Sequence, residues 1–294
     1  MAASMAPFTP DGRTRLYGLL GHPVHGSLSP SFQSAGFRSL GINAIYVALP
    51  VAPERLTVAV QGLAAAGIAG FNLTVPHKTA IVPMLDRMTP EAQAAGAVNT
   101  VRCDASDGTV RLAGTNTDGS GFVRSLDRDL GLQPRGKSFL LLGAGGSARG
   151  IAHALLRAEA STLWIANRTA ARARELAASL AATYPKAAVE ALTLEEAPDV
   201  KPQVLINTTT VGMGDGKSPV DLSQVRVEEA VVDIVYTPAE TPLLSQARAL
   251  GVKCTNGIGM LLYQGCQAFE FWTGQPAPVL PMREALLAAL RGRA

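Results

Sequence analysis

Several features are scarce in this sequence, and each scarcity excludes a class of protein. The chain has three cysteines and four histidines, too few and too scattered for a disulfide framework or a zinc site. We therefore expect no metal and a reducing, cytoplasmic location. No apolar run approaches the roughly 18 residues of a membrane helix. Residues 1–13 lack the pattern of a signal peptide, and we expect them to be frayed.

The charges are nearly balanced, which limits the partners that the chain can attract. It carries 26 basic and 23 acidic residues, a net charge of +3. So small an excess predicts neither nucleic acid nor a membrane surface as a partner, and any anion site must be local. A length of 294 residues is comfortable for two domains. We expect a soluble globular protein that acts on a small molecule.

Strand and helix signals alternate along the chain. In the first part we expect strands at 17–20, 44–49 and 71–75 and helices at 30–40 and 53–66. Residues 97–102 and 109–112 should pair as an antiparallel hairpin around the turn Asp107-Gly108. From residue 117 onward, helices alternate with strands 138–142, 162–166, 204–207 and 231–235. This alternation predicts a doubly wound parallel sheet, and therefore an α/β protein. The stretches 257–272 and 282–291 read as helices.

A glycine-rich turn follows the apolar strand 138–142 and opens a helix. The turn consists of Gly143, Ala144, Gly145, Gly146, Ser147 and Ala148, which fits G-x-G-x-x-A. In this context the motif predicts a dinucleotide site. The first glycine permits the tight turn, the second lets the backbone approach a pyrophosphate, and the small final position lets the helix pack closely. The pyrophosphate would meet free amides at a positive helix end. The alternative is a purely structural glycine turn.

The end of the next strand indicates which dinucleotide is bound. An NAD enzyme usually has Asp or Glu there to hold the ribose 2′-hydroxyl, but the sequence has Asn167, Arg168 and Thr169. Arg168 and Arg172 are four residues apart and share one side of the following helix. Two guanidinium groups suit a 2′-phosphate. We therefore expect NADP; the alternative is a solvated, arginine-rich helix start.

Polar clusters mark strand and turn ends in the first half of the chain. Singly, each has an ordinary explanation: Ser29 before Pro30 predicts a helix cap, Asp118 before Gly119 another, and Lys78 a solvated lysine. Together they suggest chemistry. Hydride transfer to a ketone needs a proton donor and groups that stabilise an alkoxide, which Lys and Asp can supply. Neutral Ser, Thr, Asn and Gln side chains suit a polyhydroxylated substrate.

In these motifs the sequence resembles the shikimate dehydrogenase family, over about residues 17–274. The matching segments are Ser27, Ser29 and Pro30, N-x-T-x-P-x-K at 72–78, G-A-V-N-T at 96–100, N-T-D-G at 116–119, the glycine turn, 167–169, and 257–261 with Gln264. Gly26 and Gln33 depart from the family pattern, which has histidine at these positions in many members.

The resemblance implies two α/β domains and a role for each. Residues 1–116 with 257–294 would form a mixed-sheet substrate domain and 117–256 a Rossmann-type NADP domain, with the site in the cleft between them. Lys78 and Asp118 would be the catalytic pair. They would bind substrate together with Ser27, Ser29, Thr74, Asn99, Tyr236 and Gln264. The cofactor would contact Gly143–Ala148, Asn167, Arg168, Thr169, Arg172, Thr208, Ile234 and Gly257.

The implied reaction is the reversible, NADPH-dependent reduction of 3-dehydroshikimate to shikimate, in aromatic amino-acid biosynthesis. Whether Lys78 transfers the proton or only stabilises the alkoxide stays open. One alternative is a quinate/shikimate dehydrogenase of broader specificity; another is a non-catalytic NADP- or metabolite-binding sensor. The sequence is compatible with a monomer and with a homodimer.

Overall fold

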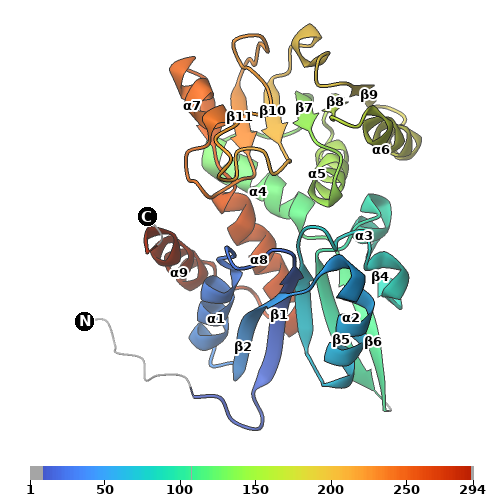
Figure 1. The fold of residues 1–294 in the computed structure, drawn as a ribbon, viewed down its shortest axis with the longest axis vertical. Helices are drawn as coiled ribbons and strands as arrows, with labels where there is room; N and C mark the ends of the chain where they lie inside the picture. The colour runs from blue at the N-terminus through green and yellow to red at the C-terminus, as the bar shows by residue number, and fades with distance from the viewer. Residues whose placement is uncertain (1–8, 107, 293–294) are drawn as a thin grey trace. The chain divides into compact units, whose positions relative to one another are not determined.

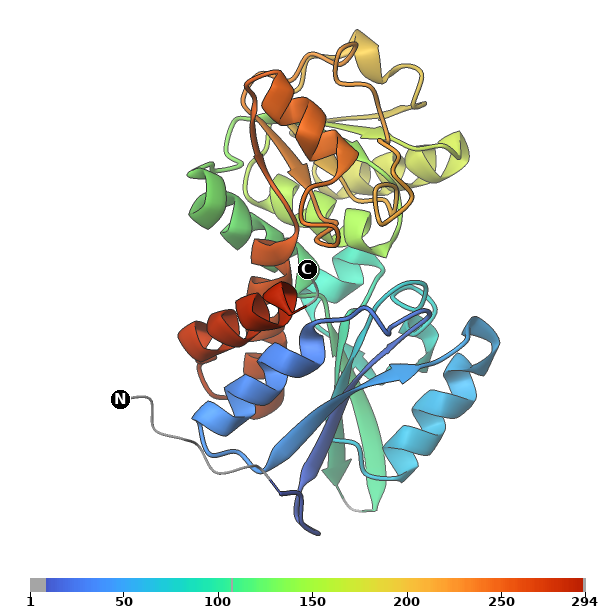
Figure 2. The ribbon, with the colours of Figure 1, turned by 60° about the vertical axis from the view of Figure 1, so that its left-hand side comes forward.

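The computed structural model describes residues 9–106 and 108–292, so the first eight residues of the expected frayed start and Asp107 of the hairpin turn lie outside it. The chain divides into two compact units (Figures 1 and 2). The first comprises the residues up to Thr89, Val98–Thr115 and the residues from Gly265 on, and the second Pro90–Ala97 and Asn116–Gln264. Throughout the described part, the helices are too short or too polar to cross a membrane.

The first unit contains a mixed six-stranded sheet, as predicted. Strand order is β2-β1-β3-β5-β6-β4. Strands β2, β1 and β3 run parallel, whereas β5 is antiparallel to both β3 and β6. The antiparallel pairing of β5 with β6 confirms the hairpin. The strands are β1 (Arg15–Gly21), β2 (Ala44–Pro50), β3 (Gly70–Leu73), β4 (Arg87–Met88), β5 (Thr100–Ser106) and β6 (Thr109–Thr115).

Helices and a cluster of aromatic rings complete the first unit. The helices are α1 (Ser29–Ser39), η1 (Pro53–Arg55), α2 (Leu56–Ala65), η2 (Val82–Met84), the later part of α8 (Ile258–Thr273) and α9 (Val279–Arg291). Tyr17 stacks on Phe37 at 4.8 Å, and Trp272 lies 5.1 Å from Tyr17. The Trp272 indole donates a hydrogen bond to the Val101 carbonyl at 2.9 Å, so the C-terminal helices are tied to this sheet.

The prediction that Ser29 caps α1 is wrong. Ser29 is the first residue of the helix, and Leu28 occupies the cap position without a side-chain hydrogen bond to the helix. The Ser29 amide instead donates to the Ser27 hydroxyl, just before the helix, at 3.1 Å. In the same way, α4 begins at Asp118 itself, and Thr117 occupies its cap position.

The second unit contains the predicted parallel sheet. Its order, β12-β11-β10-β7-β8-β9, is the 3-2-1-4-5-6 order of Rossmann folds read from the other edge. All five pairings are parallel. The strands are β7 (Ser138–Leu142), β8 (Thr162–Ala166), β9 (Ala188–Leu192), β10 (Val204–Asn207), β11 (Ala230–Asp233) and β12 (Lys253–Thr255). The edge strands β9 and β12 were not predicted.

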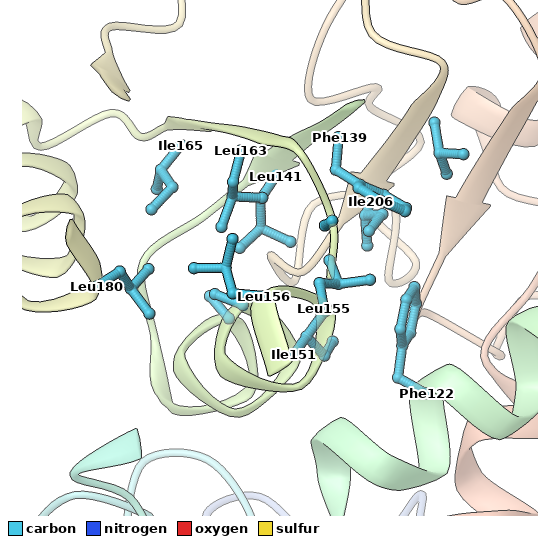
Figure 3. Packing of buried hydrophobic residues seen from close by; sticks show 14 of the residues in the cluster. Phe122, Phe139, Leu141, Ile151, Leu155, Leu156, Leu163, Ile165, Leu180 and Ile206 are labelled. Carbon is cyan, nitrogen blue, oxygen red and sulfur yellow. The ribbon is translucent and has the colours of Figure 1, made fainter. Parts of the chain in front are cut away.

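Side chains of this sheet alternate between two hydrophobic clusters, one on each face. Phe139 and Leu141 of β7 pack with α4, α5 and α6 (Figure 3), whereas Leu140 and Leu142 pack with α7. The alternation explains why the strand reads as a continuous apolar run. The helices are α3 (Pro90–Ala95), α4 (Asp118–Leu130), α5 (Gly146–Arg157), α6 (Ala170–Thr183), η3 (Ala197–Asp199) and α7 (Pro242–Ala249).

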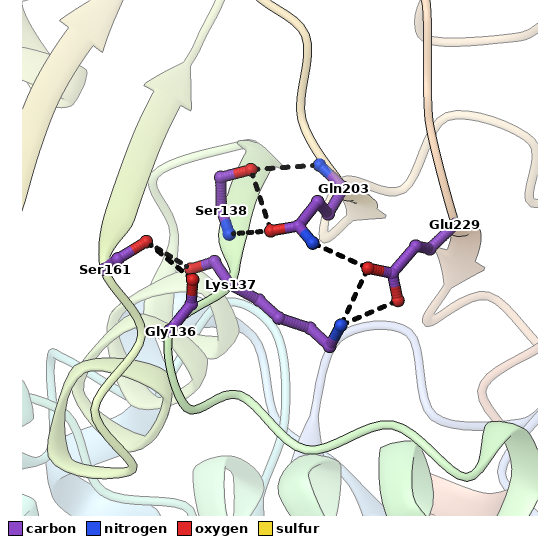
Figure 4. Close-up of polar contacts among 6 residues, drawn as sticks. All are labelled: Gly136, Lys137, Ser138, Ser161, Gln203 and Glu229. Carbon is purple, nitrogen blue, oxygen red and sulfur yellow. Dashed lines mark hydrogen bonds and ion pairs between the residues drawn. The ribbon is translucent and has the colours of Figure 1, made fainter.

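A polar network ties together the amino ends of β7, β10 and β11 (Figure 4). The Lys137 ammonium lies 2.7 and 2.8 Å from the two Glu229 carboxylate oxygens, and Gln203 donates to the same carboxylate at 2.6 Å. The Ser138 amide donates to Gln203 at 3.0 Å. The bonded Lys137 holds the pKa of Glu229 below its usual value. This network stabilises the sheet edge opposite the strand ends that carry the glycine turn.

Candidate active site

The glycine turn stands where the strand order of the second sheet reverses. In open α/β sheets, ligands bind at the carboxyl ends of the strands on either side of such a point, here β7 and β10. Gly143 has a φ of 111°, which L side chains rarely adopt. A Cβ there would lie 2.6 Å from the Thr208 hydroxyl, which itself donates to the Leu142 carbonyl at 2.7 Å. The turn thus requires glycine at this position.

The helix that follows the turn has an electropositive start. Gly145, which has no side chain to cap the helix, occupies the cap position of α5, and the first turn contains no acidic residue. A helix end of this kind favours an anion such as a pyrophosphate. Ala148 is fully buried against the sheet, which agrees with the predicted need for a small residue there.

The loop after β8 presents two arginines. The Asn167 amide donates to the Thr169 carbonyl at 2.9 Å, and Thr169 caps α6. Arg168 and Arg172 are exposed. Within the described residues neither has a carboxylate within 4.0 Å, whereas the guanidinium of Arg149 pairs with Glu175 at 2.5 Å. The two guanidinium groups fit a phosphate at this end of the sheet.

Sequence reasoning missed a buried polar network that shapes the ends of β10 and β11. Asn207 donates to Asp233 at 2.9 Å, and the Thr241 hydroxyl donates to the same carboxylate at 2.6 Å. Burial raises the pKa of Asp233, and these hydrogen bonds act in the opposite direction. The network holds the loop that begins at Thr208 and the one that begins at Ile234.

Gly257 lets its own backbone lie close to the backbone of Ile234, in the same region. A Cβ on Gly257 would overlap the Ile234 carbonyl oxygen. The Gly257 amide donates to the Val235 carbonyl at 3.2 Å. Ile234 and Gly257, both predicted to line the cofactor side, are therefore neighbours in the structure, as Gly143 and Thr208 are.

Five of the predicted substrate residues lie in the first unit, around the carboxyl ends of β1 and β3. Ser27 and Ser29 follow β1, Thr74 and Lys78 follow β3, and Asn99 precedes β5. The Leu73 amide donates to the Asn99 carbonyl at 2.8 Å, and the Val98 amide donates to the Lys78 carbonyl at 2.7 Å. These backbone bonds bring the Thr74–Lys78 segment beside Asn99.

A second buried network, also missed at the sequence level, fixes Asn99. Tyr46 donates to Asn72 at 2.7 Å, and the Asn72 amide donates to the Asn99 carbonyl at 3.0 Å and to the Thr100 hydroxyl at 2.9 Å. The Thr100 hydroxyl then donates to the Asn99 side-chain carbonyl at 3.0 Å. Burial raises the pKa of Tyr46 well above its usual value, so it stays a hydrogen-bond donor.

The remaining predicted residues lie in the second unit. Asn116 accepts a hydrogen bond from the Asp118 amide at 3.1 Å and donates to the Ala97 carbonyl at 2.9 Å, so Asp118 is held at the start of α4. Asp118 is only 3% exposed. The Thr117 hydroxyl donates to Gln264 at 3.5 Å, and Tyr236 lies half-buried after β11. Lys78 and Asp118, the predicted catalytic pair, thus belong to different units.

The protein is therefore a two-unit α/β protein with a Rossmann-type nucleotide site, the class to which nicotinamide-dependent dehydrogenases belong. The family described as "Shikimate dehydrogenase substrate binding domain" matches residues 19–101. "Shikimate / quinate 5-dehydrogenase" matches 128–209, and "Shikimate 5'-dehydrogenase C-terminal domain" matches 257–287. A shikimate dehydrogenase (NADP(+)) of Geobacter metallireducens is 46% identical over 95% of this chain and 98% of its own. The chain belongs to the shikimate dehydrogenase family.

Solved structures of the family share this fold. A shikimate dehydrogenase in complex with NADP+ is 37% identical, with a TM-score of 0.87 over 96% of this chain and 98% of its own. The enzyme from Thermus thermophilus, in complex with NADP(H) and shikimate, is 38% identical. It has a TM-score of 0.82 and covers 94% of this chain and 100% of its own.

Proposed function

We propose that this chain catalyses the NADP-linked, reversible reduction of 3-dehydroshikimate to shikimate, a step of aromatic amino-acid biosynthesis. The observation that carries the proposal is identity of 46% over 95% of the chain to a shikimate dehydrogenase that uses NADP(+). The glycine turn and the two exposed arginines provide independent physical support. The cytoplasmic location stays a prediction.

The residues of the second unit fit the cofactor. When bound, NADPH supplies the hydride. The amides of Gly143–Ala148 bind the pyrophosphate, with Asn167 and Thr169 shaping the neighbouring loop, and Arg168 and Arg172 bind the 2′-phosphate. Thr208, Ile234 and Gly257 line the nicotinamide side, where their positions are held by the buried Asp233 network.

Apart from Lys78 and Asp118, the substrate ligands are hydroxyl and amide groups, which recognise a carboxylate and several hydroxyls without adding charge. Ser27, Ser29, Thr74 and Asn99 bind from the first unit, and Gln264 and Tyr236 from the second. Asn99 is presented by a network in which Tyr46 and Asn72 are both buried and hydrogen-bonded. Such prior ordering reduces the entropy that binding must overcome.

Lys78 is the group that we place beside the oxygen of the reacting carbonyl, where a proton is needed. As hydride adds to the carbonyl carbon, the C=O double bond becomes a C–O single bond and the oxygen takes a proton. Lys78 donates this proton, or stabilises the negative oxygen while water donates it. Asp118 accepts a hydrogen bond from a substrate hydroxyl and so orients the ring. In the reverse direction Lys78, or a water beside it, takes the proton of the substrate hydroxyl while the hydride leaves the carbon for NADP+.

The family also suggests a broader specificity, because the match over residues 128–209 is to "Shikimate / quinate 5-dehydrogenase". Initial rates with shikimate and quinate, each with NADP+ and NAD+, separate the candidates. We expect the highest kcat/KM for shikimate with NADP+. Equal rates on quinate would favour the broader enzyme, equal rates with NAD+ would remove the role of Arg168 and Arg172, and binding without turnover would indicate a sensor.

A further inference from the structure

A cavity lies in the second unit, apart from the glycine turn. Its volume is about 550 Å³, within the roughly 300–1,000 Å³ of small-molecule sites. Helices α3, α4 and α5 and Tyr184, which follows α6, surround it. The lining of α5 starts at Gly150, and the turn residues 143–148, all of them described, do not take part. The cavity is therefore distinct from the cofactor turn.

The walls of the cavity are apolar and cannot easily collapse. Val123 of α4 and Ala154 and Ala158 of α5 line it, together with Gly119 and Gly150. A Cβ on Gly119 would overlap the Gly150 carbonyl oxygen, so α4 and α5 already touch through their backbones. This contact sets the spacing of the two helices beside the cavity and leaves it a preformed site.

Most charged groups on the rim are already paired. Arg157 donates to Glu91 at 2.6 Å, and Gln133 donates to Asp127 at 2.6 Å. Arg124 differs. Its guanidinium lies over the Tyr263 ring, 4.8 Å from the centroid, and among the described residues no carboxylate lies within 4.0 Å of it. Arg124 can therefore receive a ligand carboxylate.

His153 adds a neutral hydrogen-bonding group to the lining. It is 6% exposed, and burial, together with the nearby Arg149 guanidinium, lowers its pKa to about 4. The Tyr184 hydroxyl donates to the His153 carbonyl at 3.3 Å and lies 3.4 Å from Nδ1. Because that hydroxyl proton is already used, the tautomer with the proton on Nδ1 fits best, which makes Nε2 an acceptor.

We propose that this cavity binds an aromatic carboxylate whose ring carries an O–H or N–H donor. The carboxylate pairs with Arg124, the ring packs between the apolar walls beside Tyr184, and the ring donor reaches His153. Asn116 and Gly119 line the cavity and flank Asp118, so an occupant also changes turnover. That second consequence rests on the proposed function, whereas binding itself does not.

The test uses 6-hydroxy-2-naphthoate, a fluorescent acid with both groups, titrated into the full-length protein in two separate series, one with saturating shikimate alone and one with saturating NADP+ alone, so that no turnover occurs. We expect saturable binding with one site per chain. Arg124→Met should weaken it about tenfold or more, the effect of losing a charge-assisted hydrogen bond. Arg128→Met is the matched control, because Arg128 lies on α4 outside the lining, and should leave the affinity unchanged.

Ala158→Phe, which fills the cavity, should abolish binding in a protein with the wild-type circular dichroism spectrum. If that variant does not fold, Ala94→Phe fills the cavity from the exposed α3 side and should have the same effect. The proposal is overturned by lack of saturable binding, by competition with shikimate or NADP+, or by equal effects of the two arginine variants. An inactive enzyme that still binds the probe at this cavity refutes the proposed function alone.

Discussion

Replacing Gly143 by alanine should damage the protein in two separable ways. The substitution forces an L side chain to a φ of 111° and places its Cβ 2.6 Å from the Thr208 hydroxyl. Thr208 cannot move away without losing its 2.7 Å bond to the Leu142 carbonyl. Stability should therefore fall, and the turn should lose the geometry that binds a pyrophosphate.

The size of the stability loss follows from the backbone strain at residue 143 and from the lost Thr208 hydrogen bond. Backbone strain of this kind costs about 1–3 kcal/mol, and the lost hydrogen bond about 1 kcal/mol. The total of about 2–4 kcal/mol corresponds to a fall in Tm of roughly 4–16 °C for a unit of this size. Thermal unfolding followed by circular dichroism measures the fall, and calorimetric titration with NADP+ measures the loss of binding.

Gly145→Ala is the matched control. Gly145 has a φ of −85°, and a Cβ there meets no atom within 4 Å. The variant should keep the wild-type Tm, or gain a little through the less flexible unfolded chain, yet bind NADP+ weakly because the Cβ stands where the pyrophosphate approaches. Our reasoning is refuted if Gly143→Ala melts like the wild type, or if Gly145→Ala binds NADP+ normally.

Three further substitutions test the site and the sheet. Lys78→Ala should lower kcat for shikimate oxidation about 100-fold or more with little change in KM, because a proton-transfer or alkoxide-stabilising group is lost; initial rates measure this. Arg172→Met should reduce the preference for NADP+ over NAD+, as a ratio of kcat/KM, about tenfold or more. Glu229→Gln should lower the free energy of unfolding by about 1 kcal/mol at neutral pH. Since the bonded Lys137 lowers the pKa of Glu229, this contribution is present above the unfolded-state pKa and is lost as the pH falls through the folded-state pKa; urea unfolding at about pH 7 and pH 3 measures it.

Each of these three variants has a control at an exposed residue of the same type. The controls are Lys186→Ala for Lys78→Ala, Arg174→Met for Arg172→Met, and Glu228→Gln for Glu229→Gln. A Lys78→Ala enzyme that keeps most of its kcat removes Lys78 from the chemistry. Equal cofactor preferences in the Arg172 and Arg174 variants contradict the phosphate assignment. A stability difference for Glu229→Gln that persists at about pH 3 shows that charge is not its cause.

The second sheet was predictable because its central strand is local in sequence and buried on both faces. Ser138–Leu142 forms an apolar run, and the glycine turn follows it directly. The edge strands give no such signal. Ala188–Leu192 is only half-buried, and Lys253–Thr255 has three residues. Such strands form because they pair with a neighbour, here β8 and β11, and that pairing is a property of the fold.

The sequence predicts candidate site residues where one short motif contains them, and it does not reveal the contacts between residues that are distant in sequence. The Asn207–Asp233 bond joins residues 26 apart in sequence, and so does the Tyr46–Asn72 bond. No local sequence pattern predicts either of these two hydrogen bonds. The misassigned cap of α1 has a local cause, because Ser29 is already helical and its amide donates to the Ser27 hydroxyl.

The most direct test of the proposed reaction is isotope transfer. The enzyme is incubated with 3-dehydroshikimate and NADPH that carries deuterium at its transferable position, and the shikimate formed is analysed by mass spectrometry and NMR. We predict one deuterium per shikimate molecule, on the carbon that was the ketone. Shikimate without deuterium, or no shikimate at all from a folded, NADPH-binding protein, would contradict the proposal.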